Sequence, residues 1–231
     1  MIGMLKRSLF LGALALSVSG AQAAPAKTHG VLGLYGEIAD SVFVASVDKL
    51  GERVSAQGCA VARAGKVVGA NGDIGLDAPG RFVYLTCERP VLTKAAKRGM
   101  FAQTMGKPVA LMEGVIVAAE AGNVSVPASS RAYLLKVSYY NNARPDARDA
   151  DLAAIGEVTA PLDDRYVNEI AVEVHRAIGL PTPDEFVLIH YDSPAHGDRF
   201  RENNQDVLEK VGAFNKAHLT KFVYYPAAAY R

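Results

Sequence analysis

Two spacings of apolar residues run through the first half of the chain, and each predicts one type of element. From Asp40 to Gln57 apolar side chains recur every three or four positions, which predicts a helix that Asp40 caps and Gly58 ends. A second helix is predicted at 92–105, where Gly99 interrupts it. Short apolar runs bounded by glycine or proline predict strands at 30–38, 81–87 and 108–119.

The second half shows the same alternation of element types. Helical spacing predicts helices at 163–179 and 198–218. Short runs rich in β-branched and aromatic residues predict strands at 132–140, 185–191 and 220–225. The polar stretch at 141–162 is interpreted as an insertion that holds a solvated loop. The expected order of this half is therefore β-α-β-α-β.

A small, polar segment at 121–130 separates two similar halves. Residues 81–90 and 185–194 both open with a charge before Phe-Val and end in an acid and a proline. We therefore expect an α+β fold with antiparallel sheets and helices on one face, built from tandem ferredoxin-like units at 24–120 and 131–231.

The N-terminus has the pattern of a secretory leader. Lys6 and Arg7 precede a short apolar run, and the segment ends in Ala21-Gln22-Ala23, the small residues that a signal peptidase accepts. The run is about half the length needed to cross a bilayer. We expect a signal peptide at 1–23, a periplasmic or secreted protein, and no membrane anchor after processing.

Cysteine content and charge narrow the function further. Cys59 and Cys87 are the only cysteines, so an exported chain is expected to join them in a disulfide, with two free thiols or a nucleophilic thiol as the alternatives. The formal net charge is +1, and no dense cluster of Lys and Arg occurs. Nucleic acid is therefore not an expected partner.

The densest cluster of chemical groups begins at His190. On a strand, His190 and Asp192 point to the same side, and His196 follows in the next loop. These side chains are predicted as ligands of a divalent metal, or as a metal-free acid/base pair in which Asp192 orients His190. An ordinary solvated loop is the third alternative, and the sequence leaves all three open.

Side-chain parity on the strand at 132–140 supplies two further candidates. Tyr133, Leu135 and Val137 share an apolar face, which we expect to pack on helices. Lys136 and Tyr140 would then face the opposite side, toward a cavity in which they could meet His190 and contact a substrate.

The segment 131–225 resembles the dimeric α/β-barrel superfamily of ferredoxin-like modules. The likeness lies in a long first strand that ends in Tyr139 and Tyr140, a later strand that ends in Asp192-Ser193-Pro194, and the charged start of the helix that follows. Members include haem-binding and haem-degrading oxygenases, monooxygenases, cyclases and proteins of no known activity. The resemblance therefore implies a shape rather than a reaction.

Two function hypotheses follow. The first is an exported, non-catalytic module that binds a small-molecule ligand or serves as an accessory protein. The alternative is a dimeric-barrel-type enzyme, either a metal- or haem-dependent oxygenase or an acid/base catalyst, with His190 and Asp192 at its site and Lys136 and Tyr140 contacting substrate. The sequence names no cofactor. A ferredoxin-like sheet has one open face, which either the sister half or a second copy of the chain has to cover, so a homodimer is a further expectation.

Overall fold

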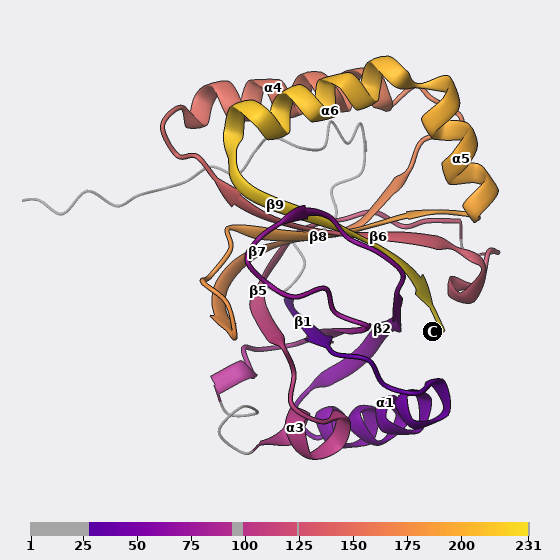
Figure 1. Cartoon of the computed structure of the whole chain (residues 1–231), viewed down its shortest axis with the longest axis vertical. Helices are drawn as coiled ribbons and strands as arrows, with labels where there is room; N and C mark the ends of the chain where they lie inside the picture. The colour runs from indigo at the N-terminus through magenta and orange to yellow at the C-terminus, as the bar shows by residue number, and fades with distance from the viewer. Residues whose placement is uncertain (1–27, 94–98, 124, 231) are drawn as a thin grey trace, which may run out of the picture.

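A computed structural model describes residues 28–93, 99–123 and 125–230. The fold is α+β: one large antiparallel sheet has helices α4, α5 and α6 against one outer face and α1 and α3 against the other (Figure 1). The predicted leader at 1–23 lies outside the described residues. In chain order, the elements of the first half are β1 (His29–Tyr35), α1 (Asp40–Ser55), β2 (Cys59–Val67), β3 (Asn71–Asp73), β4 (Arg81–Cys87), α3 (Met100–Met105) and β5 (Ala110–Ala119).

The second half repeats the same arrangement. Its elements are the short 3-10 helix η1 (Ala128–Ser130), β6 (Ala132–Tyr140), α4 (Pro145–Thr159), β7 (Val167–Ile178), β8 (Glu185–Tyr191), α5 (Pro194–Asn203), α6 (Gln205–His218) and β9 (Leu219–Ala229). Apart from the short β3 and the extra α5, each half has the order β-α-β-β-α-β. The expected β-α-β-α-β order of the second half was wrong, because it lacked one strand.

The sheet closes on itself. Its strand order is β2-β4-β1-β5-β7-β8-β6-β9-β3, and β2 pairs with β9 in addition, so eight strands form a ring. The short β3 pairs with β9 beside this closure. The inner faces of both halves meet inside this ring, in a core drawn from both. The open face from which a homodimer was expected is thus covered within one chain, and assembly stays a prediction.

Alternate residues of each strand divide between the inside and the outside of the ring. On β6, Tyr133, Leu135 and Val137 point inward and join the shared core. The outward residues Lys136 and Tyr140 lie beneath the helices. The expectation that the apolar face packs on helices was therefore wrong: the closed ring encloses the larger apolar core and takes the most apolar face of the strand.

The helix expected at 163–179 is also wrong, because these residues form β7. Ile170, Val172 and Val174 alternate along the strand and are buried in the core. β7 pairs with β5 of the first half along one edge and with β8 of its own half along the other. A partly different set of apolar residues in the segment fits helical spacing, and this misled the prediction: Val167, Ile170, Ala171, Val174 and Ile178.

Two further differences concern the helices of the second half. The insertion at 141–162 contains helix α4, which starts at Pro145, a residue favoured in the first turn. The helix expected at 198–218 is two helices, because α5 ends at Asn203 and α6 starts at Gln205. These helices, together with α4, cover the outer face of β6, β8 and β9 (Figure 1).

The first half agrees with the sequence prediction in most elements. Helix α1 buries Phe43, Val47, Leu50 and Val54, the residues that gave the helical spacing. Of the helix expected at 92–105, residues 92–93 are helical and α3 forms the end, whereas 94–98 lie outside the described residues. The predicted disulfide between Cys59 and Cys87 is confirmed, and it links directly paired residues of β2 and β4. Within the part of the chain that the structure describes, no helix is long and apolar enough to cross a membrane.

Candidate functional site

A cavity of about 980 Å³ lies between the outer face of the second-half sheet and helices α4, α5 and α6. We call it the helix-side cavity. Its floor consists of outward residues of β6, β8 and β9, among them Leu134, Val187 and Ile189. Residues of α4 and α6, such as Ile155 and Val211, form the opposite wall. Small-molecule sites in proteins have this size and this mainly apolar lining.

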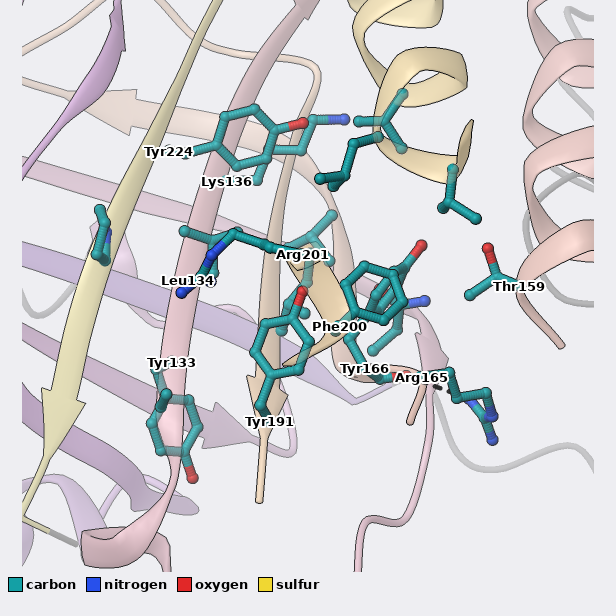
Figure 2. Close-up of a pocket in the computed structure, with 18 of the residues that line it drawn as sticks. Tyr133, Leu134, Lys136, Thr159, Arg165, Tyr166, Tyr191, Phe200, Arg201 and Tyr224 are labelled. Atoms are coloured by element: carbon teal, nitrogen blue, oxygen red, sulfur yellow. Dashed lines mark hydrogen bonds between the residues drawn. The ribbon is translucent and has the colours of Figure 1, made fainter. Parts of the chain in front are cut away.

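Aromatic side chains form the middle of the helix-side cavity. The rings of Tyr166, Tyr191 and Phe200 contact one another with centroids 5.5 to 6.3 Å apart, and two of the three contacts are edge to face. Figure 2 shows these three side chains grouped between the strands and the helices. Burial raises the pKa of Tyr191 to about 12 and also raises that of Tyr166, so both phenols keep their protons at neutral pH.

The polar groups of the helix-side cavity gather in separate places. Lys136 and Tyr224 are paired residues of β6 and β9 and lie side by side in Figure 2. The ammonium nitrogen of Lys136 is 3.3 Å from Glu185 Oε1. In Figure 2, Arg165 lies on the far side of the aromatic group from these residues, and it forms an ion pair with Glu120.

A second group of polar residues lies near one end of the closed ring. We call Arg63, Arg131, Tyr133, Glu169 and His190 the inner polar cluster. Glu169 is its centre: its carboxylate oxygens lie 2.8 Å from Arg63 Nε, 3.1 Å from His190 Nδ1 and 3.8 Å from a terminal nitrogen of Arg131. Arg63 also donates a hydrogen bond to the hydroxyl of Tyr133. One carboxylate therefore serves cationic groups from both halves of the chain.

The electrostatics of the inner polar cluster depend on Glu169. Its side chain is only 13% exposed, and burial alone would raise its pKa. The contact with His190 and the charges of Arg63 and Arg131 outweigh burial, so the pKa of Glu169 lies below its ordinary value. Glu169 is thus ionised at neutral pH and compensates two buried or half-buried guanidinium groups.

The structure separates the predicted site residues. His190 is fully buried and points into the ring, where it contacts the ring of Tyr133. Lys136 and Tyr140 lie on the other face of the sheet, beneath the helices, so the expected meeting with His190 does not occur. Of these residues Lys136 lines the helix-side cavity, whereas Tyr140 lies under the guanidinium of Arg148.

Asp192 and His196 are not placed as expected relative to His190. The polar neighbour of His190 is Glu169, and not Asp192. His196 lies on α5, where its Nδ1 accepts a hydrogen bond from the backbone N–H of Asp192, and its Nε2 is 2.8 Å from the carbonyl oxygen of Asp164. Among the described residues no three side chains of His, Cys, Asp or Glu converge as metal ligands. Metal and catalytic roles for these residues stay predictions.

Sequence reasoning missed most of the residues that this structure brings together. Tyr166 and Glu169 fell in or beside the segment that was expected to be a helix. The alternation of Ile170, Val172 and Val174 was the signal that could have revealed a strand there. Tyr224 stood in a correctly expected strand, yet its partner Lys136 became evident only from the register of β6 and β9.

Comparisons with known proteins give a likeness of fold. No protein-family model matches the chain, and no curated protein matches it. An anthrone oxidase-like protein matches with a TM-score of 0.56 and 14% identity, over 89% of this chain and 92% of that one. Chlorite dismutase from Candidatus Nitrospira defluvii matches as a variant in complex with cyanide, with a TM-score of 0.57 and 13% identity, over the same shares. Its complex with imidazole gives a TM-score of 0.55 and 11% identity, again over 89% of this chain and 92% of that chain.

These matches extend over both halves of the chain, and not only over the segment that carried the sequence resemblance. They support the resemblance to the dimeric α/β-barrel superfamily at the level of fold. At identities of 11 to 14% they show the architecture alone, because one architecture hosts many chemistries. The chemistry of this chain therefore has to be argued from its own side chains.

Proposed function

We propose that this protein binds an aromatic, mainly apolar small molecule in the helix-side cavity. The single observation that carries the proposal is a cavity of about 980 Å³ with an aromatic middle formed by Tyr166, Tyr191 and Phe200. Aromatic side chains offer large rigid surfaces to a planar ligand, and edge-to-face contacts between rings add to the gain from burial. This supports the hypothesis of a ligand-binding module.

Haem is the cofactor to consider, because the superfamily that this chain resembles has haem-binding members. The residues that line the helix-side cavity do not fit it. Haem iron in proteins is held by His, Cys, Met or Tyr. The described residues that line the helix-side cavity include no His, Cys or Met. Burial raises the pKa values of Tyr133, Tyr166 and Tyr191, that of Tyr191 to about 12, and this opposes the phenolate form that would bind iron. We therefore propose a ligand other than haem.

The alternative hypothesis, an enzyme, draws on the same comparisons. The similar structures include chlorite dismutase and an anthrone oxidase-like protein, whose names denote enzymes. That likeness is of fold alone, and His190 lines no part of the helix-side cavity. The side chains that line this cavity favour binding of a small molecule over a metal- or haem-dependent reaction at His190.

Export forms part of the proposal. The disulfide between Cys59 and Cys87 is typical of proteins that mature in an oxidising compartment. The basic and apolar start of the chain has the pattern of a leader. Together they support a periplasmic or secreted binding protein.

The test fills the cavity with a side chain. Gly156 of α4 lines the helix-side cavity, and a Cβ there would meet no atom within 4 Å. Gly156→Leu should therefore fold normally and weaken binding of the neutral probe N-phenyl-1-naphthylamine about tenfold, measured by its fluorescence increase. Gly212→Leu on α6 is the matched control, since Gly212 is exposed, equally free of close neighbours and not part of the lining.

Two results would refute the proposal. The wild-type protein could fail to bind the probe at all. The probe could also bind Gly156→Leu as tightly as Gly212→Leu, which would place it outside the helix-side cavity. Circular dichroism of both variants checks that the helices are intact.

A further inference from the structure

The helix-side cavity has an excess of positive charge. Its ionisable lining contains four cations, Arg131, Lys136, Arg165 and Arg201, and three carboxylates, Glu120, Glu185 and Asp198. Each carboxylate is paired with a cation of the lining. The carboxylate partner of Arg131 is Glu169, which lies outside the lining. A concave site with this charge balance attracts an anion.

Lys136 is a buried cation of the lining that has more donors than acceptors around it. It is 8% exposed, and its ammonium carries three N–H donors. Glu185 Oε1 accepts one hydrogen bond, and the ring of Phe214 lies 5.5 Å away. Burial alone would lower the pKa of Lys136, but the charge of Glu185 and the neighbouring Tyr224 raise it above its ordinary value. The side chain is therefore a charged donor at neutral pH.

The polar groups around Lys136 are engaged with one another and leave its ammonium few further acceptors. Tyr166 keeps its proton, because burial raises its pKa. The hydroxyl of Tyr224 accepts a hydrogen bond from Asn215 Nδ2 at 3.1 Å and donates one to Asn215 Oδ1 at 3.5 Å. Glu185 is the carboxylate of the lining beside Lys136, and it already forms an ion pair with this lysine. A ligand that satisfies the remaining donors of Lys136 therefore supplies an oxygen acceptor.

We propose that the helix-side cavity selects planar aromatic ligands that carry an anionic oxygen, as in an aryl carboxylate or a phenolate. Lys136 would donate to this oxygen, and the ring system would lie among Tyr166, Tyr191 and Phe200. This inference rests on the proposed binding function and specifies the class of ligand. The neutralised Lys136–Glu185 pair does not repel such an oxygen. Glu169 is shared by Arg63 and Arg131, so these two guanidinium groups have one carboxylate between them, and the remaining positive charge favours an anion.

The test compares two ligands of the same shape. 2-Naphthoate is anionic, and 2-naphthamide is its neutral counterpart, so their affinities for the full chain can be measured by calorimetry. The wild-type protein should bind the naphthoate about tenfold or more tightly than the amide, which is the range expected for a charge-assisted hydrogen bond in a poorly solvated site. Lys136→Met keeps an apolar side chain of similar length and should remove the preference while changing amide binding less than about threefold.

Removing Lys136 leaves Glu185 buried without its cation, so the single variant could fold poorly. The double variant Lys136→Met/Glu185→Gln makes the pair neutral and keeps its volume. It should also lose the preference for the naphthoate. Lys49→Met is the control, because Lys49 is exposed on α1 on the other side of the sheet.

The outcomes separate the two proposals. If wild-type protein binds both ligands equally, or if the double variant keeps the preference, the role of Lys136 is refuted while the cavity remains a binding site. If neither ligand binds, the proposed function is refuted as well. A preference that disappears in both Lys136 variants and persists in Lys49→Met supports the inference.

Discussion

Glu169 offers the sharpest test of how the two halves are held together. Its carboxylate lies 2.8 Å from Arg63 of the first half, and 3.1 Å from His190 and 3.8 Å from Arg131 of the second. Glu169→Gln keeps the volume and removes the charge, so the two guanidinium groups lose their shared counter-ion. We therefore expect the variant to lose native-state stability.

The magnitude follows from burial. Arg131 is buried and Glu169 is 13% exposed, whereas the side chain of Arg63 is 25% exposed and can recover some hydration. Breaking a buried ion pair on one side costs about 3–5 kcal/mol, and the partial exposure of Arg63 favours the lower end, about 3 kcal/mol. That is a large fraction of the about 5–15 kcal/mol that stabilises a typical domain.

The assay is urea unfolding followed by circular dichroism, with Glu209→Gln on the exposed face of α6 as the control. The pKa of Glu169 is lower in the folded chain than its ordinary value of 4.5. The stabilisation is therefore complete at pH values above about 4.5 and is lost as the pH falls through the folded-state pKa. A loss within about 0.5 kcal/mol of the control at pH 7, or a loss that does not shrink in acid, would refute the reasoning.

Three further predictions concern other parts of the chain. Replacing Cys59 and Cys87 by serine should cost about 3–4 kcal/mol in urea unfolding, since the bridge closes a loop of 28 positions, and an unchanged midpoint would contradict this. Gly122→Ala would place a Cβ 2.5 Å from His190 Nε2 and should destabilise by about 1–3 kcal/mol; a melting temperature equal to that of the wild-type protein would show that the loop yields freely. Expression with the natural N-terminus in a secreting bacterium should give a mature chain that begins at Ala24, as N-terminal sequencing can check, and an intact Met1 would exclude the predicted leader.

Segments whose pattern fits one spacing only were predictable from the sequence. Helix α1 was one of them, because Phe43, Val47, Leu50 and Val54 fit helical spacing and all four are buried. The strands at β4, β6 and β8 were others, since their runs are short, β-branched or aromatic, and bounded by turn residues. The pairing of Cys59 with Cys87 needed only their number and the expected compartment.

β7 shows where local pattern stops being decisive. Ile170 and Val174 are four positions apart and suit a helix, whereas Val172 between them suits a strand. The choice was made by neighbours far away in the chain, because β5 and β8 supply hydrogen-bonding partners on both edges of this segment. The positions of Tyr166 and Glu169 depend on that choice. With them it decides much of the helix-side cavity and of the inner polar cluster.

The sequence by itself determined that residues 132–140 form a strand with one apolar and one mixed face. Only the tertiary structure decided which face points inward, because closure of the ring through β2 and β9 encloses a core shared by both halves. That core takes up the most apolar face, and Lys136 is left beneath the helices while His190 is turned into the ring. Side-chain parity along a strand is a local property, but the side that is inside depends on long-range contacts between strands of the two halves.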